Sequence, residues 1–130
     1  MKKILLLSGS SLALLAVLAG AFGAHALKNI ISPEDSVTYE TAVRYQMYHA
    51  LAIIITAMFT TDANRKFLSA AGFLFIAGIL FFSGSLYLIT CLKTQNVSLP
   101  LPVVIATPLG GIMFACGWLV LAVSFFKTKY

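Results

Sequence analysis

Apolar residues along the chain fall into four runs that are separated by short polar segments. Residues 4–24, 67–92 and 101–126 contain no charged side chain, and residues 45–61 contain none beyond a possible charge on a histidine. A transmembrane helix needs about 20 apolar residues, because each residue rises about 1.5 Å through a hydrocarbon core about 30 Å thick. The second run is short for a span and must begin earlier, near Ala42.

This pattern predicts an all-α integral membrane protein that forms a single four-helix bundle over residues 1–130. The spans are predicted at about 4–25, 42–61, 67–92 and 102–126. Of all residues, 60% are hydrophobic and 10% are charged, whereas a soluble domain carries about 25% charged residues. A chain of this size cannot bury so much apolar surface within itself, so lipid must solvate the remainder.

The charged residues predict how the spans are oriented. One side of the membrane receives most of the basic residues, namely Lys2, Lys3, Arg65, Lys66, Lys127 and Lys129. The other side receives Lys28, Arg44 and Lys93. Cytoplasmic loops carry the excess of lysine and arginine, so both termini are predicted to be cytoplasmic. The net charge of +5 is likewise interpreted as a signal for orientation and as attraction to anionic lipid headgroups. The basic residues form no stripe, so no nucleic-acid binding is predicted.

A helix is predicted to begin at Ser32. Serine caps helix amino termini, Pro33 suits the first helical position, and Glu34 and Asp35 favour the positive end of the helix dipole. The helix can continue unbroken to Thr61. About its first 12 residues would then lie outside the membrane or along its surface, as an amphipathic outer segment that leads into the second span.

The first run also resembles a secretory signal, because a lysine pair precedes it and Ala24-His25-Ala26 matches an A-x-A cleavage site. The run is longer than the hydrophobic region of a signal peptide, which spans about 7–15 residues. We therefore favour an uncleaved span. Cleavage would leave three spans and an external amino terminus.

Small residues line one face of the first predicted span. They recur at steps of four and three residues and occupy a stripe about 80° wide: Gly9, Ala13, Ala16, Gly20 and Gly23. Such a stripe lets another helix backbone approach closely. The neighbouring helix can belong to the same chain or to a second copy, so a homo-oligomer through this face is one possibility.

Polar residues on the second helix are predicted to face the bundle interior. At about 100° per residue, Tyr45, Gln46 and His49 share one face of this helix. His49 lies near the bilayer midplane and is either a neutral, hydrogen-bonded histidine or a group for proton transfer or ligand binding. Glu40 and Arg44 are four residues apart and can form an interfacial ion pair, or they can face a substrate.

Depth calculated from helical rise gathers the strongly polar side chains in the outer half of the membrane. The sequence therefore predicts a polar cluster that opens outward, with candidate ligand-binding residues His25, Glu40, Arg44, Tyr45, His49, Ser83, Ser85, Tyr87 and Thr107. No metal site is predicted, because zinc requires three or four ligands. The pattern indicates no catalytic set and identifies no cofactor.

Four ordered blocks of sequence resemble a known family. They are Gly-Ala-Phe-Gly-Ala-His-Ala-Leu at 20–27, ETAVRYQMYHAL at 40–51, FSGSLYL at 82–88 and TPLGG at 107–111. Together they are similar to the transmembrane-protein-256-like family, also called domain-of-unknown-function family 423, over essentially the whole chain. The resemblance implies a four-helix, multi-pass protein of the bacterial cytoplasmic (inner) membrane and implies no activity.

Three kinds of function are compatible with these features. The leading one is a non-enzymatic bundle, in contact with membrane lipids, that binds a small amphiphile or a membrane partner through the outer-half cluster. A transport or permeation subunit would need to oligomerise and to carry a polar path across the inner half. An enzyme directed at a lipid or a quinone would use His49 with Tyr45 or Arg44, and no recognised nucleophile supports it.

Overall fold

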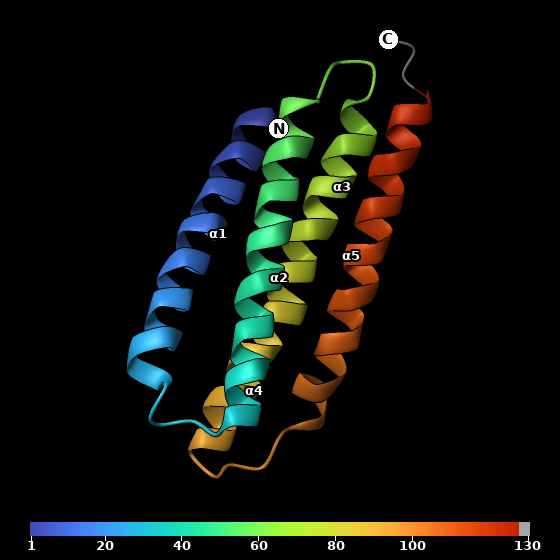
Figure 1. The fold of residues 1–130 in the computed structure, drawn as a ribbon. Coiled ribbons are helices and arrows are strands. Elements are labelled where there is room, and N and C mark those ends of the chain that lie inside the picture. Colours follow the sequence, from blue (N-terminus) through green and yellow to red (C-terminus); the bar gives the residue numbers. More distant parts are fainter. Residues whose placement is uncertain (128–130) are drawn as a thin grey trace.

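The computed structural model describes residues 1–127, which form helices joined by short loops (Figure 1). The elements are α1 (Lys2–Phe22), the π-helical η1 (Gly23–Leu27), α2 (Pro33–Met58), α3 (Arg65–Gly78), the π-helical η2 (Ile79–Ser83), α4 (Gly84–Thr94) and α5 (Leu101–Lys127). Because α1 runs on into η1, and α3 through η2 into α4, these elements make four antiparallel rods. Lys129, which contributed to the predicted orientation, lies outside the described residues.

The amino terminus and the loops between helices are divided between the two ends of the bundle. The amino terminus and the 59–64 loop lie at the upper end in Figure 1, which we call the terminal end. The 28–32 and 95–100 loops lie at the opposite end, which we call the loop end. The all-α fold and the four predicted helical regions are confirmed, whereas the orientation relative to the cytoplasm stays a prediction.

Three of the four rods are long and apolar enough to cross a membrane: Lys2–Leu27, Arg65–Thr94 and Leu101–Phe126. The rod formed by α2 is not among them. Its first half contains four charged residues, namely Glu34, Asp35, Glu40 and Arg44. A fourth crossing by α2 is therefore still a prediction.

The predicted start of α2 is confirmed. The Oγ atom of Ser32 accepts a hydrogen bond from the backbone N–H of Asp35 at 3.1 Å, and Pro33 occupies the first turn. This capping bond satisfies one of the backbone donors that have no partner within the helix. The helix then runs unbroken to Met58 and ends before Thr61.

The small-residue stripe of α1 packs against α2 of the same chain. A Cβ atom added to Gly9 would lie 2.7 Å from Cγ1 of Ile54 and 3.0 Å from the carbonyl oxygen of Ala50. Nearer the loop end, Tyr39 donates its hydroxyl to the carbonyl oxygen of Ala19 at 2.9 Å. The stripe therefore brings two helices of one chain together, and its predicted use between copies stays a prediction.

The interior of the bundle is apolar and receives side chains from all four rods. Its core consists of Leu5, Ala52, Ile53, Ala57, Leu68, Ala71, Phe75, Ile79, Phe114 and Leu121. Large hydrophobic side chains also cover the outside, including Leu14, Leu80 and Leu119. A soluble protein of this size would not expose so many of them, so the outer surface suits lipid.

The segment η2 interrupts the third rod with a π-helical turn. It lies where α5 approaches most closely, because a Cβ atom on Gly110 would collide with the backbone of Phe82. A π turn bonds residue i to residue i+5 and so holds one residue more than an α turn. The extra residue rotates α4 about its own axis relative to α3. As a result Ser85 faces α5 and Tyr87 faces α2. The sequence pattern predicted one uninterrupted helix here.

Candidate functional site

The nine candidate residues lie in several different surroundings instead of one polar cluster. His25 is exposed on η1, and no hydrogen bond or ring contact joins it to the other eight. Ser83 is buried in η2, and its Oγ has no hydrogen-bond partner in the described part of the chain. The other seven residues either bond across helix interfaces or line two separate grooves.

Hydrogen bonds between helices use four of these residues, namely Ser85, Tyr87, Thr107 and, as described below, His49. The hydroxyls of Ser85 and Thr107 lie 2.7 Å apart and join α4 to α5. Tyr87 donates its hydroxyl to Oε1 of Gln46 at 3.0 Å, and Gln46 donates through Nε2 to the carbonyl oxygen of Leu12 at 2.9 Å. Such bonds stabilise helix packing within a membrane. These side chains therefore hold α1, α2, α4 and α5 together.

A groove between α2 and α5 is lined almost entirely by aromatic side chains. It has a volume of about 580 Å³ and is lined by Tyr45, Tyr48, His49, Phe82, Gly111, Phe114 and Trp118. We call it the aromatic groove. Tyr45, Tyr48 and Trp118 are exposed, so the groove opens sideways from the bundle, toward lipid.

His49 forms part of the wall of the aromatic groove and is buried. Its Nδ1 lies 2.8 Å from the carbonyl oxygen of Tyr45, and its Nε2 lies 3.2 Å from Nε1 of Trp118. An indole nitrogen can only donate, so Nε2 must accept and the proton of the neutral ring must sit on Nδ1. Both ring nitrogens are therefore occupied, which agrees with the interpretation of His49 as a neutral, hydrogen-bonded histidine.

The walls of the aromatic groove are stacked rings. His49 lies nearly parallel to Phe114, with ring centroids 3.4 Å apart, and Tyr45 stacks on Phe82 at 4.7 Å. Neither Tyr45 nor Tyr48 uses its hydroxyl in a hydrogen bond with another described residue. The groove thus offers flat, apolar walls together with two unused phenol hydroxyls.

Phe82, Phe114 and Trp118 were absent from the candidate residues that the sequence suggested. Depth in the membrane marks polar side chains as candidates, and it gives no such signal for apolar rings. A signal was available, because Gly111, Phe114 and Trp118 recur at steps of three and four residues, which places them on one face of α5.

A second groove lies at the loop end, between the end of α1 and the first half of α2. It has a volume of about 250 Å³ and is lined by Gly20, Gly23, Ala24, Ile31, Ser36, Tyr39, Glu40, Val43 and Arg44. We call it the loop-end groove. Glu40 and Arg44 do not form the predicted ion pair, and the ion pair of the described residues joins Lys93 to Asp35.

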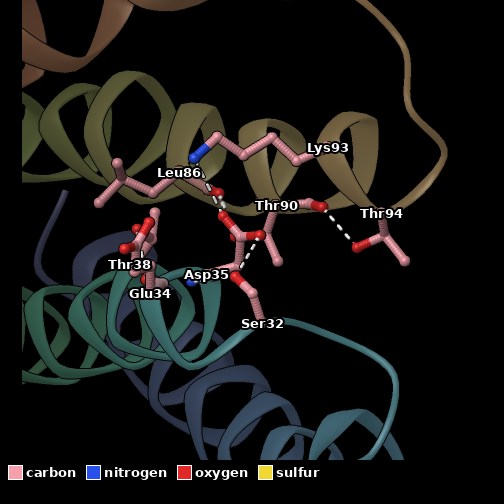
Figure 2. A network of polar contacts seen from close by, with 8 residues as sticks. All are labelled: Ser32, Glu34, Asp35, Thr38, Leu86, Thr90, Lys93 and Thr94. Atoms are coloured by element: carbon pink, nitrogen blue, oxygen red, sulfur yellow. Dashed lines mark hydrogen bonds and ion pairs between the residues drawn. The ribbon is translucent and has the colours of Figure 1, made fainter.

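Figure 2 shows that ion pair and the polar contacts around it. Asp35 accepts a hydrogen bond from the Ser32 hydroxyl at 2.8 Å and one from Nζ of Lys93 at 3.0 Å. The Ser32 hydroxyl and, next, Lys93 hold the pKa of the Asp35 carboxyl below its usual value. Thr38, Thr90 and Thr94 donate to carbonyl oxygens one helical turn earlier. The Asp35–Lys93 contact joins the start of α2 to the end of α4.

These features define a helical membrane protein with a groove open toward lipid on one side of the bundle. The chain matches, over residues 19–111, the family described as protein of unknown function (DUF423), and it belongs to that family. This confirms the resemblance suggested by the four sequence blocks.

Curated relatives extend over nearly the whole chain. A UPF0382 membrane protein of Staphylococcus haemolyticus is 38% identical over 127 residues, which cover 96% of this chain and 97% of the relative. A UPF0382 membrane protein of Staphylococcus aureus is 39% identical, with the same coverage of both chains. One from Staphylococcus saprophyticus is 37% identical and covers 96% of this chain and 98% of its own. No solved structure matches the chain.

Proposed function

We propose that the protein crosses the bacterial cytoplasmic membrane four times, with both termini in the cytoplasm. Lys2, Lys3, Arg65 and Lys66 lie at the terminal end of the bundle, which favours the cytoplasmic side for that end. The rod formed by α2 runs alongside the other three between the two ends (Figure 1). A carboxy-terminal reporter that is active only in the cytoplasm tests the orientation, and an inactive reporter would contradict it.

We further propose that the protein is a non-enzymatic binder of a membrane-dissolved amphiphile whose headgroup is a flat conjugated ring, such as a quinone. The observation that supports this most is the aromatic groove. Its stacked walls, His49 on Phe114 and Tyr45 on Phe82, match the faces of a planar ring, since aromatic rings associate by offset stacking and edge contacts.

The size and position of the aromatic groove suit this kind of ligand. A volume of about 580 Å³ falls within the range of about 300–1,000 Å³ that small-molecule pockets occupy. The groove opens sideways, so an apolar tail can remain in the lipid while the ring enters. The unused hydroxyls of Tyr45 and Tyr48 can donate hydrogen bonds to ring carbonyl oxygens.

The two hydrogen bonds of the His49 ring favour a binding protein over an enzyme. A general base must have a free nitrogen within reach of the proton that it removes. In His49 one nitrogen faces the carbonyl oxygen of Tyr45 and the other faces the indole of Trp118. The ring therefore acts as a fixed part of the wall.

Trp118 provides a direct test, because it is the single tryptophan of the chain and lines the groove. We expect a quinone added to protein in lipid nanodiscs to quench its fluorescence with a saturable dependence on concentration. The matching isoprenoid alcohol, which has the tail without the ring, is expected to leave the fluorescence unchanged.

Two variants separate specific binding from collisional quenching. Gly111→Leu places a side chain inside the groove and should abolish saturation, whereas Ala115→Leu introduces the same residue at an exposed position of α5 and should preserve it. Quenching that rises linearly with quinone in the wild type, or that Gly111→Leu leaves unchanged, would contradict the proposed function.

A further inference from the structure

Glu40 and Arg44 are opposite charges that share the loop-end groove without neutralising each other. They lie one helical turn apart on α2, a spacing at which such residues commonly pair. Here both side chains are exposed and line the groove, and neither forms an ion pair or hydrogen bond with another described residue. Charged groups at a membrane surface gain most when a counter-charge meets them, so this pair is available to a ligand.

The other charges near this groove do not compete for the pair. Asp35 and Lys93 bond to each other at 3.0 Å, on the side of α2 that meets α4 (Figure 2). Lys28 in the adjacent loop and Glu34 in the first turn of α2 are exposed and do not line the groove. The loop-end groove therefore presents one carboxylate and one guanidinium.

Apart from the hydroxyls of Ser36 and Tyr39, the remainder of the loop-end groove is apolar. Small residues of α1 and η1, Gly20 and Ala24, form one wall with Val43 opposite. Val17 lies one turn closer to the bilayer centre on α1 and is exposed. A ligand whose charged part rests on Glu40 and Arg44 can therefore extend an apolar part along α1.

We propose that the loop-end groove binds the headgroup of a phospholipid that carries both a phosphate and an ammonium group. Arg44 lies one turn, about 6 Å, deeper in the bundle than Glu40. In a membrane the phosphate of such a lipid lies next to the acyl chains, and the ammonium lies farther out. The guanidinium of Arg44 thus meets the phosphate, for which its planar fork of donors is suited, and the carboxylate of Glu40 meets the ammonium.

This site is independent of the aromatic groove, because the two grooves have no lining residue in common. It differs from general attraction to anionic lipid, since the groove presents equal and opposite charges. The lipid expected is a zwitterionic phosphatidylethanolamine, and an anionic phosphatidylglycerol of the same chain length should bind more weakly.

Native mass spectrometry of detergent-purified protein with equal amounts of these two lipids tests the proposal. We expect preferential retention of phosphatidylethanolamine. Arg44→Ala and Glu40→Gln should each reduce that retention by about tenfold, the effect of losing one charge-assisted contact. Lys28→Ala removes a basic residue of the same end that does not line the groove and should change nothing.

A charge-swapped double variant gives a sharper test. Glu40→Arg combined with Arg44→Glu keeps both charges and their spacing but reverses their depths, so retention should fall as far as in Arg44→Ala. Circular dichroism of each variant should match the wild type, because both positions are exposed. Saturable quenching of Trp118 should persist in all of them, which separates this proposal from the proposed function.

Three results would overturn the proposal. The first is equal retention of the two lipids. The second is an undiminished preference of the charge-swapped variant for phosphatidylethanolamine, which would mean that Glu40 and Arg44 do not bind the headgroup. The third is competition by soluble phosphoethanolamine at the concentration of the lipid, which would assign the site to a soluble ligand.

Discussion

Trp118 of α5 donates its indole N–H to Nε2 of His49 on α2, with 3.2 Å between the two nitrogens. The bond joins helices on either side of the aromatic groove and also sets the tautomer of the histidine ring. In an apolar environment a polar group left without a partner is costly. The indole N–H of Trp118 and the Nε2 atom of His49 therefore each satisfy the other's hydrogen-bonding requirement.

Replacing Trp118 with Phe should destabilise the bundle beyond the packing that it removes. The change leaves Nε2 of His49 without a donor, and hydrogen bonds between membrane helices contribute on average about 0.6 kcal/mol, with a maximum near 1.7 kcal/mol. His49→Phe likewise leaves the indole N–H of Trp118 without its acceptor. Because only the double variant removes both partners, it should lose less stability than the two single variants added together. Equilibrium unfolding in mixed micelles measures this cycle, and simple additivity would contradict the bond.

Adjacent glycines of α5 should respond oppositely to alanine. A Cβ atom on Gly110 would collide with the backbone of Phe82, whereas one on Gly111 would lie 3.9 Å from Cδ2 of Phe82, an ordinary contact. Gly110→Ala should cost about 1–3 kcal/mol, as overpacking does. Gly111→Ala should be neutral or slightly stabilising, because alanine favours helix. Thermal unfolding compares the two variants, and the reverse order would refute the close approach of α5 to η2.

The contact between α1 and α2 predicts a second contrast between glycines. Gly9→Ala meets the backbone of Ala50 and the side chain of Ile54, whereas the atom nearest to a Cβ on Gly20 is Cγ1 of Val43 at 3.4 Å. Gly9→Ala should therefore destabilise by about 1–3 kcal/mol, and Gly20→Ala should be tolerated. Unfolding and native mass are measured together. A change of subunit number in both variants, without loss of monomer stability, would place the stripe between copies.

The Asp35–Lys93 pair should make a small contribution to stability that depends on pH. Since the pKa of Asp35 is lowered in the folded protein, the contribution is complete above the ordinary aspartate pKa and is lost as the pH falls through the lowered one. The Lys93 side chain is 43% exposed, so solvent screening limits the pair to at most about 1 kcal/mol. Melting of wild type and Asp35→Asn should differ near neutral pH and converge in strong acid. A constant difference would contradict this assignment.

Features set by neighbouring residues along the chain could be predicted well from the sequence. The four helical regions follow from the length of the apolar runs, and the start of α2 follows from the capping chemistry of Ser32. The inward face of α2 was predicted in part: Ala42, Gln46 and Ile53 are buried there, whereas Tyr45 is exposed. Periodicity and caps are local properties, so they need no knowledge of which helix lies beside which.

Helix neighbours could not be predicted in the same way. Depth follows from helical rise, but depth alone does not show which side chains of different helices meet. Gln46 and His49 lie on the same stripe of α2, yet Gln46 turns toward α1 and α4, whereas His49 turns toward α5. One predicted cluster therefore became several separate contacts. Trp118 was missed because an aromatic ring in an apolar span is typical of helix packing.

Because η2 is a π turn, the number of residues from 79 to 83 determines how the side chains of α4 are oriented. Most of the residue types in this stretch matter less for that orientation. Leu80 is exposed, and exchanging it for another apolar residue should matter little. Deleting it would rotate every later side chain of α4 by about 100°. Tyr87 would then leave Gln46 at the same time as Ser85 leaves Thr107. In this stretch, the number of residues is itself a structural constraint, separate from the residue types.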